Sequence, residues 1–320
     1  MKKKKIVFRF NDEFNFPAPL KEKVIQPFAD TFEFCEISGN WNIEQIKDAV
    51  AFIGWPTDHM IKAMENLQWL QLPSAGANHF ANHPLLADDV TVTNSSGVFG
   101  VAGGEHIIAL MLAFARQIPI HVHQTAEHIW KQNPRSVQIE GSTVAIVGLG
   151  DIGSQAAIRL KAFGARVIGI KRQINDKPDY IDALYDIQSI GRVLSESDFV
   201  INVLPLTPET RNLFNHSLIM NIKPGAVFIN VGRGQTVDEQ ALAEALKTGH
   251  LGGAGLDVTA VEPLPETSPL WDLPNVIITS HSLGITPDKQ EKRAALIKEN
   301  LERFRDGKMM ANVVNRKLGY

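Results

Sequence analysis

Val-Ala-Ile-Val-Gly-Leu-Gly-Asp-Ile-Gly, residues 144–153, is the stretch that decides the fold of this chain. It has the pattern of a buried β-strand that runs through a Gly-x-Gly-x-x-Gly turn into a helix. Gly148 permits the tight turn, Gly150 lets backbone N–H groups approach a pyrophosphate, and Gly153 lets the helix pack closely on the strand. The anion then lies at a helix N-terminus, where unpaired N–H groups and the macrodipole favour negative charge. The stretch therefore predicts a dinucleotide-binding domain.

Two cations, Lys171 and Arg172, follow the next predicted strand, about twenty residues downstream, where a site for NAD usually carries a carboxylate. A carboxylate there would repel the 2′-phosphate of NADP(H), whereas these cations attract it, and Arg172 can bind it bidentately. Two exposed cations that merely end a strand would look the same, and Asp176 and Asp179 could supply the missing acid. We expect NADP(H) to be favoured over NAD(H).

The composition bounds the class of protein. A chain of 320 residues, 44% hydrophobic and 21% charged, has room for two cores. The net charge of −3 gives no footprint for nucleic acid or an anionic membrane, and no window approaches the roughly 18 apolar residues of a membrane span. Cys35 is the only cysteine, which excludes intrachain disulfides and cysteine-based metal sites. We expect a cytoplasmic protein with no metal, membrane or nucleic-acid partner and, for lack of an apolar leader, no secretion signal.

The dinucleotide stretch begins in mid-chain, so another domain must fold from the first hundred or so residues. There, short apolar segments alternate with helical ones, which indicates a parallel sheet covered on both faces. The predicted strands are Lys5–Phe10, Phe32–Cys35, Val50–Ile53, Trp69–Leu72 and Val90–Thr93, and the predicted helices are Leu20–Ala29, Ile43–Ala49 and Asp58–Met64.

The second half continues the same alternation after a long apolar helix. This helix is predicted from Gly103 to Arg116 and on through Pro119 toward Trp130, a residue that we expect in a dimer interface. Asp238 caps a further helix, which ends near Gly249. Six strands are predicted, at Val144–Val147, Arg166–Ile170, Phe199–Val203, Val227–Asn230, Gly253–Leu256 and Val276–Thr279.

A last amphipathic helix, from Pro287 to Phe304, has no place in a six-strand unit and should pack on the N-terminal domain. The predicted fold is α/β, with two Rossmann-like doubly wound domains and a cleft between them. Residues 1–100 and 287–320 form a flavodoxin-like substrate domain, and residues 101–286 form the dinucleotide-binding domain.

Polar side chains follow three consecutive strands of the second domain. Arg233 lies between two glycines after one strand, Glu262 precedes Pro263 after the next, and His281 follows the third. In open α/β sheets, ligands bind beyond the carboxyl ends of the strands. Histidine exchanges protons near neutrality, a carboxylate stabilises the imidazolium, and arginine binds carboxylate and carbonyl oxygens. The three side chains are therefore expected to face one crevice.

With these motifs the chain resembles the D-isomer-specific 2-hydroxyacid dehydrogenases over about 300 residues, in particular the NADP-preferring, glyoxylate/hydroxypyruvate reductase-like branch. The matching stretches are Leu72-Pro73-Ser74-Ala75-Gly76, Thr93-Asn94-Ser95-Ser96-Gly97, Glu105-His106, the glycine turn, Leu204-Pro205-Leu206-Thr207-Pro208-Glu209-Thr210-Arg211, and the three strand-end motifs. The resemblance implies a homodimeric oxidoreductase that reduces 2-oxo acids to D-2-hydroxy acids.

The resemblance also implies roles for the site residues. Arg233 would orient the substrate carboxylate and carbonyl, Glu262 would pair with His281, and His281 would be the general acid/base. Backbone N–H groups of Ser74, Ala75 and Gly76 would take the substrate carboxylate, and Asp257 would reach the nicotinamide carboxamide. The expected cofactor-binding residues are Gly148, Gly150, Asp151, Ile152, Gly153, Lys171, Arg172, Leu204, Pro205, Thr210, Val231, Gly232, Arg233, Asp257, His281 and Gly284.

Three pairs depart from the family pattern, Gly103-Gly104, Thr259-Ala260 and Ser282-Leu283, and we expect them to alter the walls near the cleft. The alternative function is a nucleotide-sensing binding protein, as in the related transcriptional corepressors, which can keep the same three side chains. The sequence carries no evident extra recognition segment, which favours the enzyme.

Overall fold

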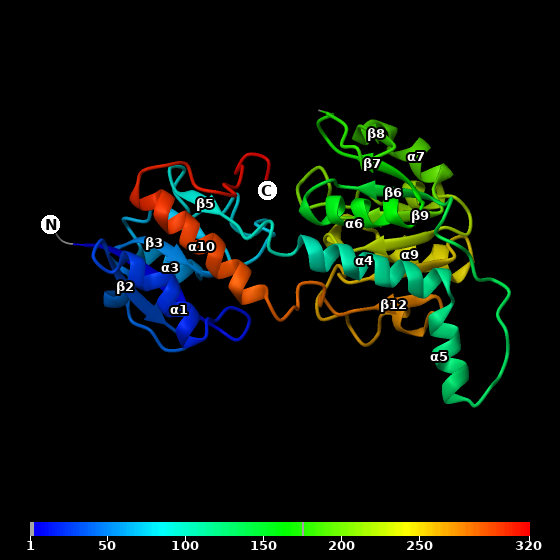
Figure 1. Cartoon of the computed structure of the whole chain (residues 1–320), viewed down its shortest axis with the longest axis horizontal. Coiled ribbons are helices and arrows are strands. Elements are labelled where there is room, and N and C mark those ends of the chain that lie inside the picture. The colour runs from blue at the N-terminus through cyan, green and yellow to red at the C-terminus, as the bar shows by residue number, and fades with distance from the viewer. Residues whose placement is uncertain (1–2, 175) are drawn as a thin grey trace. The chain divides into compact units, whose positions relative to one another are not determined.

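The computed structural model describes residues 3–174 and 176–320, which form two compact units (Figure 1). The first unit runs to Val98 and resumes at Thr286–Tyr320, and the second is Phe99–Ile285. Both units are built on a parallel sheet with helices on its two faces. The predicted α/β fold class is confirmed.

The first unit has a five-stranded parallel sheet in the order β2-β1-β3-β4-β5, which is the flavodoxin-like order. Its strands are β1 Lys4–Arg9, β2 Phe32–Ile37, β3 Ala49–Ile53, β4 Trp69–Gln71 and β5 Thr91–Thr93. Each strand lies within three residues of its predicted bounds, because short apolar segments between turns mark buried parallel strands well.

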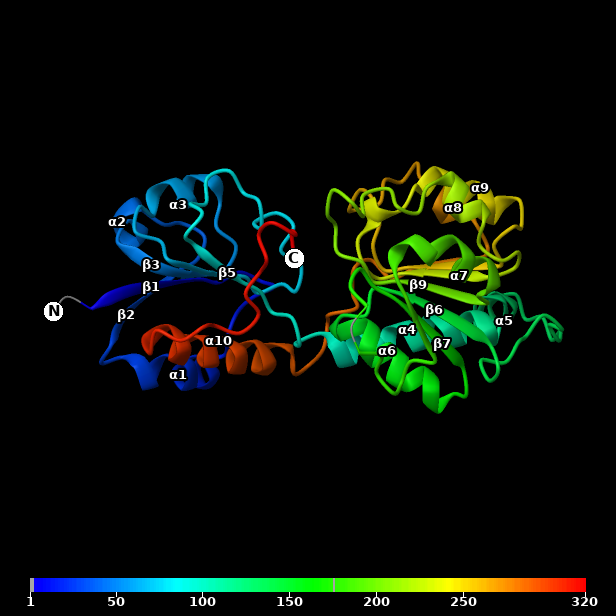
Figure 2. The same ribbon diagram turned by 90° about the horizontal axis from the view of Figure 1, so that it is seen from above.

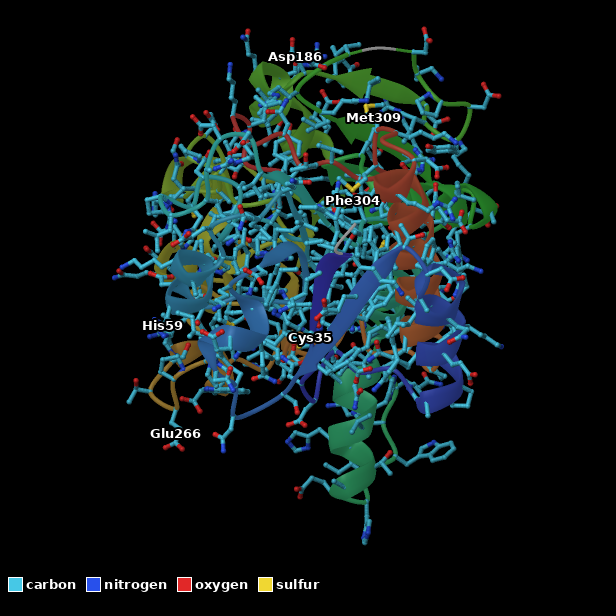
Figure 3. All side chains as sticks on the ribbon, turned by 90° about the vertical axis from the view of Figure 1, so that its left-hand side faces the viewer. Cys35, His59, Asp186, Glu266, Phe304 and Met309 are labelled. Atoms are coloured by element: carbon cyan, nitrogen blue, oxygen red, sulfur yellow. The ribbon has the colours of Figure 1, made fainter. Side chains whose placement is uncertain are left out.

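Helices cover both faces of this sheet (Figure 2). α1 (Ala18–Ile25) and α10 (Lys289–Arg305) pack on one face, and α2 (Ile43–Ile46) and α3 (Asp58–Ala63) on the other. On α10, Phe304 (Figure 3) has its ring centroid 5.3 Å from that of Trp69 of β4. The C-terminal helix therefore packs on the N-terminal sheet, as predicted.

The second unit has a seven-stranded parallel sheet in the order β12-β11-β10-β9-β6-β7-β8. Strand order reverses between β6 and β9, so their carboxyl ends mark the topological switch point of a dinucleotide fold. The strands are β6 Thr143–Val147, β7 Arg166–Ile170, β8 Ala183–Tyr185, β9 Phe199–Asn202, β10 Val227–Asn230, β11 Gly253–Leu256 and β12 Val276–Ile278. The prediction of six strands was wrong, since β8 is a half-buried edge strand of only three residues, too short to stand out in the sequence.

One face of this sheet carries α4 (Gly100–Ala115) and α6 (Asp151–Ala162), and the other carries three helices (Figure 2). Those three are α7 Ile190–Glu196, α8 His216–Met220 and α9 Glu239–Lys247. A Cβ on Gly103 would lie 2.7 Å from Ile152, and one on Gly104 would lie 2.9 Å from the backbone of Gln155. We expected Gly103-Gly104 at a cleft wall; instead, these glycines let α4 and α6 pack closely.

The long helix predicted through Pro119 toward Trp130 is broken. Gln117 has φ +56°, and Pro119 lies in the first turn of a separate helix, α5 (Ile118–Ala126), which is bent 66° from α4. Every residue of α5 is at least partly exposed, and the helix projects from its unit (Figure 1). Within the described residues no single helix is long and apolar enough to cross a membrane, although the bent α4–α5 pair passes that test when taken together.

Candidate active site

The loops after β10, β11 and β12 bring the predicted arginine, glutamate and histidine to neighbouring strand ends. These three strands are adjacent and parallel, so their carboxyl ends lie on one edge of the sheet. Arg233 follows β10 by three residues, Glu262 lies in the loop after β11, and His281 lies just beyond β12. The sheet topology thus places all three at the edge where ligands bind in such folds.

Glu262 and His281 form a direct pair. Nδ1 of His281 lies 2.7 Å from Oε2 of Glu262, and Oε1 of Glu262 accepts the backbone N–H of Thr259 at 3.1 Å. His281 has φ +54°, and its own N–H donates to the carbonyl of Asp257 at 2.6 Å. Because Nδ1 is held by the carboxylate, Nε2 is the nitrogen left to exchange a proton with a ligand. The imidazole is 52% exposed, so a ligand can reach it.

Arg233 is held by close contacts between backbones. A Cβ on Gly232 would lie 2.5 Å from the carbonyl oxygen of Leu204, and one on Gly234 would lie 1.9 Å from the carbonyl carbon of Thr259. Nη1 of Arg233 donates to the carbonyl of Gly232 at 2.7 Å. Burial lowers the pKa of Arg233, and the charge of Glu262 partly offsets this effect. A half-buried guanidinium beside a carboxylate suits the binding of an anionic ligand.

Asp257 organises the loop that carries His281. Its buried carboxylate accepts the hydroxyl of Thr279 at 2.7 Å and the N–H groups of Ser282 at 2.9 Å and Leu283 at 3.3 Å. Nε2 of His106, on α4, lies 2.9 Å from the hydroxyl of Thr279. Sequence reasoning gave His106 and Thr279 no role, and only their place in matching motifs could have drawn attention to them.

A cavity of about 380 Å³ borders the pair. It is lined by both members of the pair together with Asp257, Thr259, Pro263, Leu264, Trp271, Ile278 and Ser280. This cavity lies in the second unit alone, and its walls combine the two ionisable side chains with apolar ones.

The glycine turn fits a bound pyrophosphate. Gly148 has φ +106°, and a Cβ on Gly153 would lie 2.1 Å from the carbonyl oxygen of Gly148, so neither position accepts a larger residue without strain. A Cβ on Gly150 would meet no described atom within 4 Å, which leaves open space at the start of α6. Among the described residues, no side chain caps the N-terminus of α6. This terminus can therefore receive the phosphates of a dinucleotide.

The other predicted cofactor residues lie at the same edge of the second sheet. The carboxylate of Asp151 lies against the first turn of α4, where a Cβ on Gly100 would be 2.0 Å from Oδ1. The hydroxyl of Thr210 donates to the carbonyl of Pro205 at 2.7 Å and shapes the loop after β9. Ile152 is in the first turn of α6, Leu204 and Pro205 follow β9, Val231 and Gly232 follow β10, and Gly284 follows the His281 loop.

Lys171 and Arg172 lie at the end of β7. The N–H of Lys171 donates to Tyr185 of β8 at 3.1 Å, and the side chain of Arg172 is exposed. The hydroxyl of Thr207, and to a smaller extent the charge of Arg172, lower the pKa of Glu209. Sequence reasoning considered Asp176 and Asp179, which are both exposed, but it missed Glu209 as the acid that acts on Arg172.

In the first unit, the loop Ser74–Gly76 has its carbonyl groups occupied. The carbonyl of Ser74 accepts Ser95 N–H at 2.9 Å, that of Ala75 accepts the Asn94 amide at 2.7 Å, and that of Gly76 accepts the Ser74 hydroxyl at 2.9 Å. The N–H groups of Ser74, Ala75 and Gly76 donate to no acceptor within the described part of the chain. This loop therefore has N–H donors available to an anion, and its role in substrate binding stays a prediction.

Two side chains that the sequence did not single out support this loop. Nε1 of Trp55 donates to the hydroxyl of Ser74 at 3.3 Å, and Nε of Arg293 donates to the carbonyl of Pro73 at 2.8 Å. Burial lowers the pKa of Arg293 to about 10. In the described ranges, no group of three His, Cys, Asp or Glu side chains is arranged to hold a metal ion.

Comparison with known proteins gives the family context of this geometry. Residues 108–282 match the model of the D-isomer specific 2-hydroxyacid dehydrogenase NAD binding domain. A glyoxylate reductase from Korarchaeum cryptofilum (strain OPF8) is 31% identical over 288 residues, which cover 86% of this chain and 86% of that protein.

Two solved structures extend the similarity over the whole fold. A D-isomer specific 2-hydroxyacid dehydrogenase from Xanthobacter autotrophicus Py2, in complex with NADPH and MES, gives a TM-score of 0.87 at 29% identity and covers 100% of both chains. An NADPH-dependent glyoxylate/hydroxypyruvate reductase from Sinorhizobium meliloti, in complex with NADP and sulfate, gives a TM-score of 0.85 at 27% identity and covers 99% of this chain and 100% of that one.

Proposed function

The chain belongs to the D-isomer specific 2-hydroxyacid dehydrogenase family and is an NAD(P)-dependent oxidoreductase, and we propose that it reduces 2-oxo acids to D-2-hydroxy acids with NADPH. The candidate substrates are glyoxylate, hydroxypyruvate and longer 2-oxo acids. The observation that carries the proposal is the 2.7 Å contact between His281 and Glu262, beside Arg233 and on the same sheet edge as the dinucleotide turn.

The proposed chemistry assigns one task to each of these side chains. A bound nicotinamide supplies the hydride that reduces the 2-oxo carbon. Protonated His281 donates a proton to the 2-oxo oxygen from Nε2, while Glu262 stabilises the imidazolium and fixes its orientation through Nδ1. Arg233 offsets the negative charge that develops on the same oxygen. We also propose that the N–H groups of the Ser74–Gly76 loop bind a carboxylate, since they donate to no acceptor within the described residues.

A substrate panel tests the proposal. Purified protein is mixed with NADPH and each of glyoxylate, hydroxypyruvate, pyruvate, phenylpyruvate and 4-methyl-2-oxopentanoate, and the loss of absorbance of the reduced nicotinamide is followed. We expect oxidation of NADPH with at least one acid and a D-2-hydroxy acid as the product on chiral chromatography. Oxidation with none of them, by a protein that binds NADPH, would contradict the reductase function and favour a nucleotide-sensing protein.

Arg172→Ala tests the proposed preference for NADPH. The variant should raise KM for NADPH about tenfold and leave KM for NADH within about a factor of two, because only NADPH carries the 2′-phosphate. Lys171→Ala should act in the same direction. Arg166→Ala is the matched control, since its exposed side chain lies at the amino end of the same strand. A wild-type kcat/KM that is equal for the two cofactors, or higher for NADH, would refute the preference.

Glu209→Gln should change KM for NADPH in the opposite direction. The carboxylate of Glu209 acts on Arg172 and would compete with the 2′-phosphate for it. Its removal should lower KM for NADPH about two- to threefold, a modest effect because both side chains are exposed to solvent. An unchanged KM would mean that Glu209 does not compete for Arg172.

We also propose a homodimer that forms through α5 and the segment after it. Ile118, Val122, Ile129 and Trp130 expose 47, 64, 50 and 101% of their surface, an apolar series that a partner would cover. Multi-angle light scattering at micromolar concentration should give twice the mass of the 35.3 kDa chain. Val122→Glu with Trp130→Glu should shift the protein toward the monomer, and a wild-type monomer would refute the proposal.

The single cysteine, Cys35, supports a further proposal of a reducing, cytoplasmic location.

A further inference from the structure

Two side chains from one neighbouring segment hold the peptide groups of Ala260. This residue lies in the loop between β11 and Glu262, two residues before the glutamate. The side-chain amide of Gln235 donates to the carbonyl of Ala260 at 2.9 Å, and Oε1 of Glu239 accepts the N–H of the same residue. Gln235 lies in the 3-10 turn after Arg233, and Glu239 is the first residue of α9. One segment therefore carries Arg233 and also fixes the loop that carries Glu262.

The backbone around Ala260 is closely packed and has little freedom to move. The position of a Cβ on Gly234 lies 2.0 Å from the carbonyl oxygen of Thr259 and 2.3 Å from the nitrogen of Ala260, so the two backbones are in direct contact. Thr259 in turn donates its N–H to Glu262 at 3.1 Å, and its hydroxyl donates to the carbonyl of Val261 at 2.8 Å. A displacement of Ala260 would therefore also move Thr259, and with it the Glu262 carboxylate that holds His281.

Glu239 also brings a second negative charge to the site. Burial raises the pKa of Glu239, the N–H of Ala260 opposes that rise, and the charge of Glu262 adds to it. Further ionisable groups around the pair are Arg233, which acts on Glu262, and Asp257 with His106 behind the His281 loop. A negative charge close to Glu262 favours the protonated imidazole, because like charge on the carboxylates is relieved when His281 carries a proton.

A role in helix capping does not account for Glu239. An acidic residue at the first position of a helix interacts favourably with the helix dipole wherever it points. In α9, however, Asp238 already caps the terminus, since its carboxylate accepts the N–H of Ala241 at 3.0 Å. The carboxylate of Glu239 is directed instead to the loop after β11.

We propose that Glu239 is a positioning residue that fixes Glu262 against His281 and places a second negative charge near the Glu262 carboxylate. This role rests on the proposed reductase function, in which the pair supplies the proton to the substrate. Gln235 shares the positioning role but not the electrostatic one, because its amide is neutral.

Three variants separate the two parts of the role. Glu239→Ala removes both the acceptor and the charge, Glu239→Gln keeps an acceptor oxygen without the charge, and Gln235→Leu removes a neutral donor. Glu244→Gln is the control, because Glu244 is an exposed residue on the same helix. For each full-length protein, kcat and kcat/KM are measured with NADPH and the best 2-oxo acid from about pH 5 to pH 9. Circular dichroism melting curves establish that each variant is folded.

We expect Glu239→Ala to lower kcat about 30-fold and Glu239→Gln to restore it to within about threefold of the wild type. In both variants the midpoint of the pH profile should move lower, since the loss of a negative charge disfavours the protonated pair. Gln235→Leu should lower kcat about tenfold with an unchanged midpoint. Wild-type rates and midpoints in both Glu239 variants would overturn the proposal. A loss of rate with an unmoved midpoint in Glu239→Gln would leave Glu239 a structural residue only.

A second readout does not depend on turnover. The imidazole signal of His281 is identified in NMR spectra by its loss in His281→Asn, and it is then titrated in the wild type and in Glu239→Gln. The titration midpoint should be lower in the variant. If the wild type oxidises NADPH with none of the acids, the proposed function fails. This titration still decides whether Glu239 acts on His281.

Discussion

His281→Asn is expected to lower kcat for 2-oxo acid reduction roughly 1,000-fold, because the variant has no group that can donate a proton at the position of Nε2. Asparagine is the appropriate replacement, since His281 has φ +54° and asparagine tolerates that conformation better than alanine does. The affinity for NADPH, measured by the fluorescence of the reduced nicotinamide, should change by less than about threefold.

The pH profile provides an independent check on this assignment. In the proposed mechanism of reduction, the protonated imidazole is the active form, so kcat/KM of the wild type should fall as the pair loses its proton with rising pH. In His281→Asn this limb should disappear. Glu262→Gln should keep the limb but lower kcat about 100-fold, because the amide cannot stabilise the imidazolium.

His216→Asn is the matched control for this prediction. His216 lies on the same unit, exposes 60% of its side chain and faces the carboxylate of Glu244 at 3.8 Å, so it forms a similar but looser pair away from the strand ends. The control should retain wild-type kcat. A His281→Asn variant that keeps more than about a tenth of the wild-type kcat would rule out His281 as the general acid.

The sequence predicted most of the fold because both sheets are parallel and buried. Strands such as Arg166–Ile170, Val227–Asn230 and Gly253–Leu256 have the predicted bounds, since apolar segments between turns leave few alternatives. The errors lie where local signals are weak or mixed. Ile43–Ala49 looked like one helix, but α2 ends at Ile46 and β3 begins at Ala49, because the sheet takes the last residue of that apolar segment.

The prediction of one long helix through Pro119 was wrong for a different reason. Proline is compatible with the first turn of a helix as well as with a kink inside one, so Pro119 could not by itself separate these cases. The structure resolves the ambiguity at Gln117, whose left-handed backbone ends α4 before α5 begins. Nothing in the sequence around Gln117 indicates this left-handed conformation.

The sequence predicted those residues of the candidate site that directly follow a strand. It did not predict the residues that reach the site through contacts between distant parts of the chain. Arg233 and His281 lie just beyond strands that the sequence located. The contacts of His106 with Thr279 and of Arg293 with Pro73 span 173 and 220 residues. A single sequence carries no signal for such pairs, because each depends on how distant elements pack after folding.

Arg233→Ala is expected to lower kcat/KM for 2-oxo acids about 1,000-fold, because it removes the proposed anchor for the substrate and the positive charge that we propose beside the 2-oxo oxygen. The guanidinium is half-buried next to Glu262, so it acts in a less screened setting than a surface arginine. Added guanidinium ions at millimolar concentration should restore part of the activity of this variant. Arg166→Ala, with an exposed side chain at the opposite edge of the sheet, should behave as the wild type.

Arg233→Lys distinguishes a general need for charge from a need for arginine. Burial lowers the pKa of Arg233, and arginine starts high enough to remain charged. A lysine starts about two units lower and would face the same burial, so its proton is lost closer to neutrality. The variant should therefore lose about 100-fold in kcat/KM at neutral pH and lose more as the pH rises toward about 9. A lysine variant with wild-type activity across this range would contradict the proposed role, because a single point charge would then suffice where the structure holds a planar, two-pronged donor.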